Sequence, residues 1–270
     1  MYSFIFPCEP FNIKKVDEHF KEEFDLFKLK GFNVCLIDLE EKLLKGNFDC
    51  SSKFIYRGWM LSNQEYDVLE SLIKNKNCEL LTNKENYYQS HYLFNQYQNK
   101  EKTIGTFQYT PETVFCSEND IDDTLNNLNW DSFFVKDYVK SLTTERGSVA
   151  NNKEEVKEII ELIKYYKGSI EGGISLRKVQ SFMENTEVRY FVLNGKVYSP
   201  NGKYHNILEN INQIHNQPFF SVDVILDENG KEWIVEIGDG QVSDLKGKCW
   251  NTEDFVAVSY THLTLPTMIG

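Results

Sequence analysis

The sequence has neither a long basic run nor a long apolar run, and each absence excludes a class of partner. Acidic side chains outnumber basic ones, 41 to 29, and the net charge of −12 is spread along the chain. Nucleic-acid binding draws much of its affinity from lysine and arginine that neutralise phosphates, so we expect no nucleic-acid partner. No apolar stretch approaches the ~20 residues of a membrane span, and no signal-peptide pattern opens the chain. We therefore expect a cytoplasmic protein with no membrane partner.

Two motifs that often reveal a site are also missing. The six cysteines are scattered, with no C-x-x-C pair. This indicates reduced cysteines of a cytoplasmic protein, not a zinc site or a disulfide framework. The phosphate-binding loop G-x-x-x-x-G-K-[ST] is absent as well. A nucleotide, if one binds, must therefore be held in another way.

Strands and helices alternate in the first part of the chain. Short apolar runs predict strands at 2–6, 32–38 and 54–60, and apolar residues at helical spacing predict helices at 16–30 and 63–76. The run at 32–38 is almost wholly apolar, as a strand covered on both faces should be. A strand, a helix and a strand joined by short links typically form a right-handed parallel crossover. We therefore expect a small parallel sheet here.

The rest of the chain predicts antiparallel pairs. A helix at 83–97 precedes a polar stretch at 99–111, where we place the domain boundary. Asn-Gly between alternating apolar runs is the strongest short-range hairpin signal, and it occurs in two places. The expected fold class is therefore α/β (α+β). The elements predicted in this part are strands at 113–116, 132–139 and 174–182, helices at 121–128 and 153–166, and hairpins at 187–199 and 219–239.

Basic residues inside or beside apolar runs are the first candidates for a site. Arg57 lies within one such run, and we expect it to form an ion pair rather than to contact a substrate. Lys136 lies near the end of the strand FFVKDYV, before Lys140, Ser141 and a polar stretch that ends at Asn152. A strand-end lysine followed by a flexible loop can hold a phosphate by a point charge plus loop amides. The alternative is a surface lysine before a mobile loop.

The hairpin at 219–239 is the stretch around which the rest is organised. We take Asn229-Gly230 as a two-residue turn, which fixes the register of the two strands. One side of the hairpin is then wholly apolar and belongs in a core, while two carboxylates face each other at roughly 5 Å on the other side. The predicted facing pairs are Leu226–Trp233, Ile225–Ile234, Val224–Val235, Asp223–Glu236 and Val222–Ile237.

The facing carboxylates of Asp223 and Glu236 have two interpretations. Facing acids repel each other, but a cation between them would make a site, because Mg²⁺ binds a few carboxylates together with substrate phosphates. The alternative is an exposed edge hairpin whose acids are solvated. The following Gly238-Asp239-Gly240 favours a site, since glycines let the backbone approach a ligand closely. On the other hairpin, Glu187 and Arg189 share a strand face and form either a structural pair or a clamp for transferring phosphate.

In their order along the chain, these motifs resemble the ATP-grasp family of carboxylate–amine ligases. The lysine strand K-D-Y-V-K-S, the E-x-R strand and the ending V-E-x-x-D-G-Q-V-S carry the resemblance. It implies a small α/β pre-grasp domain at 1–103 and a two-lobed ATP-grasp domain with antiparallel sheets at 104–257. The cofactors that it implies are ATP and Mg²⁺.

The resemblance also implies roles for individual residues. Lys136 would contact the ATP phosphates, the loop after Lys140 would close over them, and Arg189 would steady the γ-phosphate. In one departure from the family pattern, Gly238 stands where an asparagine is usual, so a ligand is missing and the number of metal ions is left open. The implied set is Arg189 as the catalytic residue; Lys136, Lys140, Ser141, Arg177, Lys178, Val179, Gln180 and Glu187 as ATP-binding residues; and Asp223, Glu236 and Asp239 as metal ligands.

The implied function is ATP-dependent formation of an amide bond between a carboxylate and an amine through an acyl phosphate. The substrates would be small molecules or peptides, and the oligomeric state is left open. One alternative is a non-catalytic ATP-binding module, which the missing asparagine favours. Another is a phosphotransferase that stops at the phosphate ester.

The end of the sequence differs from the rest. Residues 258–270 resemble the translated end of a sequencing adaptor more than a protein segment. We therefore treat them as an artefactual tail that packs on nothing. We expect the helix that begins at Thr252 to have continued in the natural protein.

Overall fold

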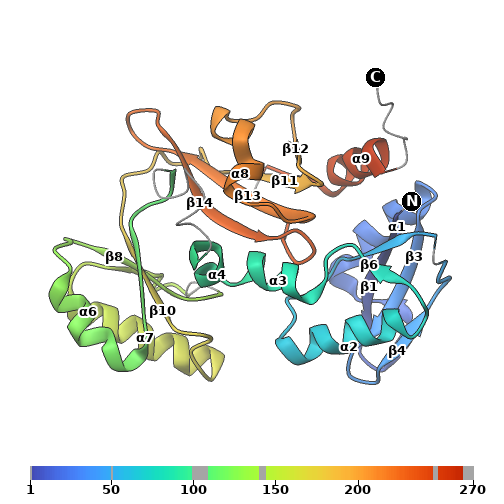
Figure 1. Cartoon of the computed structure of the whole chain (residues 1–270), viewed down its shortest axis with the longest axis horizontal. Coiled ribbons are helices and arrows are strands. Elements are labelled where there is room, and N and C mark those ends of the chain that lie inside the picture. Colours follow the sequence, from blue (N-terminus) through green and yellow to red (C-terminus); the bar gives the residue numbers. More distant parts are fainter. Residues whose placement is uncertain (1, 50, 99–108, 140–143, 246–248, 264–270) are drawn as a thin grey trace.

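The computed structural model describes residues 2–49, 51–98, 109–139, 144–245 and 249–263, which form three sheets with flanking helices (Figure 1). The first sheet lies at one end of the molecule and the second at the other, with the third between them (Figure 1). This arrangement confirms the predicted mixed α/β class. None of the helices in these ranges is both long and apolar enough to cross a membrane.

The first sheet is built on the central strand β1, which pairs in parallel with β3 and β5. This pairing confirms the predicted parallel crossover. The faces of β1 alternate between two cores: Phe4 and Phe6 pack with α1, and Ile5 packs with α2. The sheet order is β4 (Leu43–Lys45), β3 (Asn33–Asp38), β1 (Tyr2–Glu9), β5 (Lys53–Tyr56) and β6 (Glu79–Leu80), with β2 (Asn12–Val16) paired to β1; the helices are η1 (Glu18–Phe20), α1 (Lys21–Leu29) and α2 (Asn63–Lys74).

Two helix predictions in this region are corrected. The first helix begins at Lys21, because residue Val16 belongs to β2 and Asp17 caps the short turn η1 through the backbone N–H of His19. The helix predicted at 83–97 is broken at Tyr92, whose backbone is extended, into α3 (Lys84–His91) and α4 (Leu93–Gln98). The Gln96 side chain donates to the carbonyl of Ile237 at 2.7 Å and so fixes α4 against the third sheet. Most of the predicted boundary stretch, at 99–108, lies outside the described residues.

The second sheet is antiparallel and carries its helices on one face. Apolar residues of α7 (Val156, Ile159, Ile160, Ile163) pack on Phe133, Val135 and Leu176 of the strands. Asn152 caps the start of α7, and Gly168, with φ of +84°, ends it. The sheet order is β7 (Thr113–Cys116), β10 (Ile174–Lys178), β8 (Phe133–Asp137) and β9 (Val149–Ala150), and the helices are η3 (Glu118–Asp120), α6 (Ile121–Asn127) and α7 (Lys153–Lys167).

The third sheet contains both predicted hairpins. Asn194 and Gly195 have φ of 47° and 82°, the positive values that a tight two-residue turn requires. The sheet order is β12 (Lys196–Tyr198), β11 (Val188–Leu193), β13 (Phe219–Leu226) and β14 (Glu232–Asp239), with η4 (Asn206–Asn210) and α8 (Ile211–Ile214) on its apolar face.

The register of the β13–β14 hairpin agrees with the prediction at its base and differs near its tip. Asp223 faces Glu236 and Val222 faces Ile237, as predicted. Beyond them Val224 faces Ile234, Ile225 faces Trp233 and Leu226 faces Glu232. The turn is one residue longer than predicted, since the Gly230 N–H closes onto the carbonyl of Asp227 at 2.8 Å and Gly230 has φ of +79°. A β-bulge at Val235 restores the register, so Ile234 enters the core in place of Val235.

The last helix, α9 (Thr252–Leu263), joins the first sheet to the third. It lies against α1 (Figure 1), and Phe255 packs on Phe27 and on Phe191. Val258, the first residue of the expected tail, is partly buried against the same core. The expectation that the tail packs on nothing is therefore wrong at Val258, while residues 264–270 lie outside the described residues.

Candidate functional site

A cavity of about 440 Å³ lies between the second and third sheets. Strand β8 contributes Lys136, β10 contributes Arg177, and β13 and β14 contribute Ile225 and Val235 on the facing side. Six of the residues predicted to bind ATP line it together: Lys136, Arg177, Lys178, Val179, Gln180 and Glu187. The two others, Lys140 and Ser141, lie outside the described residues.

Arg177 connects the two sheets that form this cavity. Its Nη1 donates to the carbonyl of Val235 at 2.5 Å, and its Nε donates to Oγ1 of Thr113 at 3.2 Å. The carbonyl that it reaches belongs to the residue of the β-bulge. Arg177 therefore holds part of the cavity wall in place, in addition to lining it.

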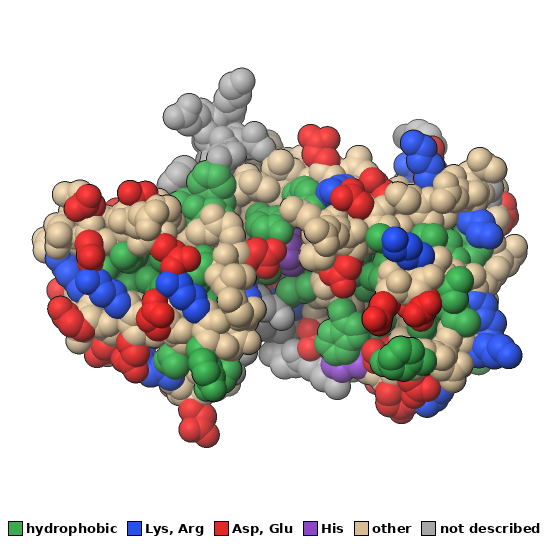
Figure 2. Space-filling view, turned by 90° about the horizontal axis from the view of Figure 1, so that it is seen from below, with side chains coloured by type: hydrophobic (Ala, Val, Ile, Leu, Met, Phe, Trp, Pro, Cys, Tyr) green, Lys and Arg blue, Asp and Glu red, His purple; other side chains and the backbone are tan. Residues whose placement is uncertain are grey.

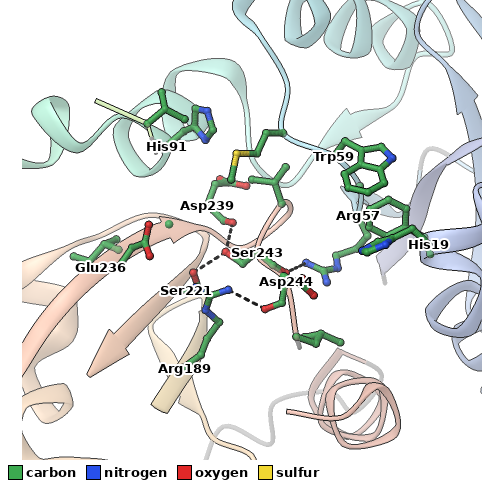
Figure 3. A pocket seen from close by; sticks show the side chains of 18 of the residues that line it. His19, Arg57, Trp59, His91, Arg189, Ser221, Glu236, Asp239, Ser243 and Asp244 are labelled. Carbon is green, nitrogen blue, oxygen red and sulfur yellow. Dashed lines mark hydrogen bonds between the residues drawn. The ribbon is translucent and has the colours of Figure 1, made fainter. Parts of the chain in front are cut away.

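A second and larger cavity, a cleft of about 800 Å³, opens beside the first. Three parts of the chain form it: the segments around α1 and β5, the helices α3 and α4, and strand β14 with the loop that follows it (Figure 3). Lys136 and Glu236 line both cavities. Their side chains approach to 3.8 Å between Nζ and Oε1, so this pair forms the wall that the two cavities share.

Arg189 and Asp223 form a buried ion pair at the base of the cleft. Nε and Nη2 of Arg189 donate to the two carboxylate oxygens of Asp223 at 2.7 and 2.8 Å, and Nη1 donates to the carbonyl of Asp244 at 2.8 Å. Burial lowers the pKa of Arg189, but the hydrogen bond and the charge of Asp223 outweigh it and raise the pKa overall. The predicted repulsion between Asp223 and Glu236 is therefore relieved by an arginine of β11, with Arg189 opposite Asp223 in the sheet.

Asp239, the third predicted metal ligand, is a buried carboxyl group with one oxygen unsatisfied. Its Oδ1 accepts from the backbone N–H and the side-chain amide of Gln241, at 2.9 and 3.1 Å. Its Oδ2 has no hydrogen-bond partner among the described residues. Burial raises the pKa of Asp239 to about 7, although the hydrogen bonds from Gln241 act in the opposite direction.

The three predicted metal ligands do not form a cluster. In the described part of the chain, no three Asp, Glu, His or Cys side chains are grouped closely enough to hold a metal ion. Asp223 and Asp239 are each 1% exposed, and both oxygens of Asp223 are engaged by Arg189. Glu236, with 44% of its side chain exposed, can offer its carboxylate to an incoming ion.

The position of the missing asparagine is surrounded by two serine hydroxyl groups. A Cβ atom on Gly238 would lie 3.1 Å from Oγ of Ser221 and 3.3 Å from Oγ of Ser243. The two Oγ atoms are 2.7 Å apart, and Ser243 donates to the carbonyl of Asp239, also at 2.7 Å (Figure 3). A carbonyl only accepts, so the proton of Ser243 is used there and Ser221 must donate to Ser243. Ser221 therefore presents only lone pairs to the cleft that it lines.

Arg57 forms the ion pair that the sequence predicts. Its Nε and Nη2 donate to the two carboxylate oxygens of Glu23 at 2.6 and 3.0 Å, and its Nη1 donates to the carbonyls of Gly240 and Ser243 at 2.6 and 3.2 Å. The residue thus fixes the loop after β14 to the first sheet. An arginine inside an apolar run was the only sequence signal for this contact. Ser221 and Trp59, which also line the cleft, gave no signal.

Comparisons with known proteins agree with this geometry. A sequence model that describes an ATP-grasp domain, of clade family 3, matches residues 89–258. Comparison with curated proteins gave no match.

Solved structures show the same fold at low sequence identity. D-alanyl-alanine synthetase A from Vibrio cholerae is 10% identical with a TM-score of 0.59, over 97% of this chain and 98% of that chain. N5-carboxyaminoimidazole synthetase from Staphylococcus aureus, complexed with ADP, is 14% identical with a TM-score of 0.59, over 98% of this chain and 78% of that chain. The macrocyclase MdnC from Microcystis aeruginosa, bound with the precursor peptide MdnA, is 9% identical with a TM-score of 0.55, over 96% of this chain and 99% of that chain. Because the family model covers more than half of the sequence, the chain belongs to the ATP-grasp family.

Proposed function

We propose that the protein is an ATP-dependent ligase that joins a carboxylate to an amine. The observation that carries this proposal is the wall that the two cavities share at Lys136 and Glu236. A nucleotide in the smaller cavity would bring its terminal phosphate to this wall, where a carboxylate in the cleft can reach it. The ligase names of the structural neighbours support the same reaction class.

The reaction proceeds in two displacements. A carboxylate oxygen of the first substrate attacks the γ-phosphorus of ATP, the bond from that phosphorus to the β–γ bridging oxygen breaks, and ADP leaves. The amine nitrogen of the second substrate then attacks the carbonyl carbon of the acyl phosphate. The bond from carbon to the phosphate oxygen breaks, inorganic phosphate leaves, and the nitrogen loses a proton. In such phosphoryl transfers the protein acts mainly by positioning and by electrostatic stabilisation.

Two basic residues fit these steps. Lys136 is 7% exposed at the shared wall, where its ammonium group can hold a phosphate as a point charge. Arg189 lines the cleft, and the hydrogen bonds of the described residues use three of its five N–H groups. The remaining two are available for the oxygens of the transferring phosphate, which is the catalytic role that we propose for it.

The residues present fit a magnesium ion only in part. Mg²⁺ would supply charge neutralisation on the phosphates. Glu236 is the carboxylate that fits, because it is exposed at the shared wall beside Lys136. Asp223 would have to accept an ion in addition to Arg189, and Asp239 is buried. We therefore propose that phosphate oxygens provide most of the coordination, with Glu236 as the main ligand from the protein.

The neighbours' names suggest the range of substrates. One neighbour is a D-alanyl-alanine synthetase and another is a macrocyclase bound with a peptide, so small molecules and peptides are both proposed for this chain. The cytoplasmic location and the division at 103/104 remain predictions from the sequence.

The experiment that tests the function is a screen of ADP release. Amino acids and short peptides are supplied in pairs with ATP, with Mg²⁺ or with a chelator, and products are identified by mass spectrometry. We expect Mg²⁺-dependent ADP release together with an amide product, and loss of both in Lys136→Ala. ATP binding without ADP release would indicate a non-catalytic module. A stable phosphate ester without an amide would indicate a phosphotransferase.

A further inference from the structure

The charges that line the large cleft are unevenly matched. Among the described residues, the Lys and Arg side chains of its wall are Arg57, Lys136 and Arg189, and each already has a carboxylate partner. Glu18 and Glu22 also line the cleft, and neither is in an ion pair within the described part of the chain. The cleft therefore has acceptor groups to offer and few unused cations, which favours a positively charged ligand at this end.

A buried acceptor in the same cleft points independently to a ligand that donates hydrogen bonds. The side chain of Asp239 is among those that line the cleft (Figure 3), it is 1% exposed, and its Oδ2 has no partner in the described structure. Buried polar atoms are nearly always hydrogen-bonded, so an unsatisfied carboxylate oxygen calls for a donor from outside the chain. Ser221 adds a second acceptor, because its proton is committed to Ser243.

An exposed aromatic ring lies beside the two unpaired acids. Trp59 lines the cleft with half of its surface exposed. Its Nε1 donates to Oδ2 of Asp17 at 3.0 Å, and the rings of His19 and Phe20 lie 4.6 and 5.1 Å from it (Figure 3 shows Trp59 and His19). The face of a tryptophan attracts cations. Figure 2 shows acidic, hydrophobic and histidine side chains together around the hollow on this side of the molecule.

We propose that the amine substrate carries a second positive charge, as a basic amino acid or a diamine does, and that Glu18, Glu22 and Trp59 bind this charge. The reacting amine then lies deeper in the cleft, where Ser221 and Asp239 accept its hydrogen bonds. This places the amine on the side of the cleft away from the nucleotide cavity. The inference rests on the proposed ligase function and names the substrate class of its second step.

Isothermal titration with matched amino acids tests the inference. The probes are L-lysine, L-norleucine, which has the same chain length without the ammonium group, and L-2-aminoadipate, which carries a carboxylate. The protein is loaded with Mg²⁺ and the β,γ-imido analogue of ATP. We expect L-lysine to bind on the order of tenfold more tightly than L-norleucine, since two partly exposed charge contacts contribute about two- to fivefold each. L-2-aminoadipate should bind most weakly.

Two variants test whether the named residues are responsible. The double variant Glu18→Gln/Glu22→Gln should bring the affinities of L-lysine and L-norleucine close together. The matched control Glu40→Gln/Glu41→Gln makes the same change in net charge at exposed residues outside the cleft and should leave the tenfold preference intact. Trp59→Leu should weaken L-lysine binding about two- to fivefold, the size of an exposed cation–π contact.

Several results would overturn the inference. They are a lack of measurable L-lysine binding, equal binding of L-lysine and L-norleucine, tighter binding of L-2-aminoadipate, and a preference that persists in Glu18→Gln/Glu22→Gln. The failure of the proposed function gives a different result. If L-lysine binds as described but no amide forms with any carboxylate, the ligase proposal fails while the cation site stands. If amides form only with neutral amines, the ligase proposal stands and the cation site fails.

Discussion

Removing Arg189 should destabilise the protein strongly, because Asp223 would be left as an uncompensated buried charge. The two side chains are 11% and 1% exposed and share two hydrogen bonds of 2.7 and 2.8 Å. Breaking a buried ion pair of this kind by removing one partner costs about 3–5 kcal/mol. For a chain of this length we expect Arg189→Met to lower the melting temperature by roughly 10 °C. Asp223→Asn should also be destabilising, since it leaves the buried guanidinium without its carboxylate.

The double variant Arg189→Met/Asp223→Asn separates the pair from its members. Replacing both charges by neutral groups of similar size should cost less than the sum of the two single changes, with a coupling energy of about 2 kcal/mol or more. Urea unfolding of the four proteins gives this energy directly. Glu187→Gln is the control, because Glu187 is the partner of Arg189 that the sequence alone suggests, and we expect it to change stability by less than about 0.5 kcal/mol. Additive single effects, or a large effect of Glu187→Gln, would refute the pairing described here.

Three further predictions concern separate parts of the chain. Lys136→Ala should weaken ADP binding in a calorimetric titration by about tenfold or more, the size of a hydrogen bond to a charged group, whereas the surface variant Lys157→Ala should not; equal binding would remove Lys136 from the nucleotide site. Burial raises the pKa of Asp239 to about 7 from an ordinary value of 3.8, so its contribution to stability is fully present below about pH 4 and is lost as the pH rises through 7. Asp239→Asn should flatten the loss of unfolding free energy over that range, which amounts to at most about 4 kcal/mol, and an unchanged pH profile would contradict the raised pKa. Removing residues 258–270 should lower the melting temperature by a few degrees, since Val258 packs on the core and burial of its side chain is worth about 1 kcal/mol; no change in a thermal melt would support the expectation that this segment packs on nothing.

The sequence predicted the order of the elements well, because periodicity and turn residues are local signals. The run at 32–38 became a strand covered on both faces, and the Asn194-Gly195 turn formed with both φ values positive. Failures occurred where a single hydrogen bond decides between alternatives. Asp17 caps η1 and delays the start of α1, and the longer Asp227–Gly230 turn shifts the outer half of the hairpin.

The site was predictable where residues share an element and unpredictable where they come from different ones. Six of the predicted nucleotide residues line one cavity because they lie on β8, on β10 and next to them, and on the strand end before β11. The partner of Asp223 could not be inferred from the hairpin alone, since Arg189 reaches it from the neighbouring strand β11. The same holds for Arg57, whose partners Glu23 and Gly240 lie far from it in the sequence.

The bulge at Val235 makes the tip of the hairpin a remote adjuster of the link between the lobes. Shortening the turn by one residue would return the outer half to the simple register and smooth out the bulge, while the row of Asp223 and Glu236 stays in place. The carbonyl of Val235 would then turn away from Nη1 of Arg177, which it now meets at 2.5 Å. An insertion or deletion at a surface turn can therefore loosen or tighten the contact of one lobe with the other without altering a single residue of the site.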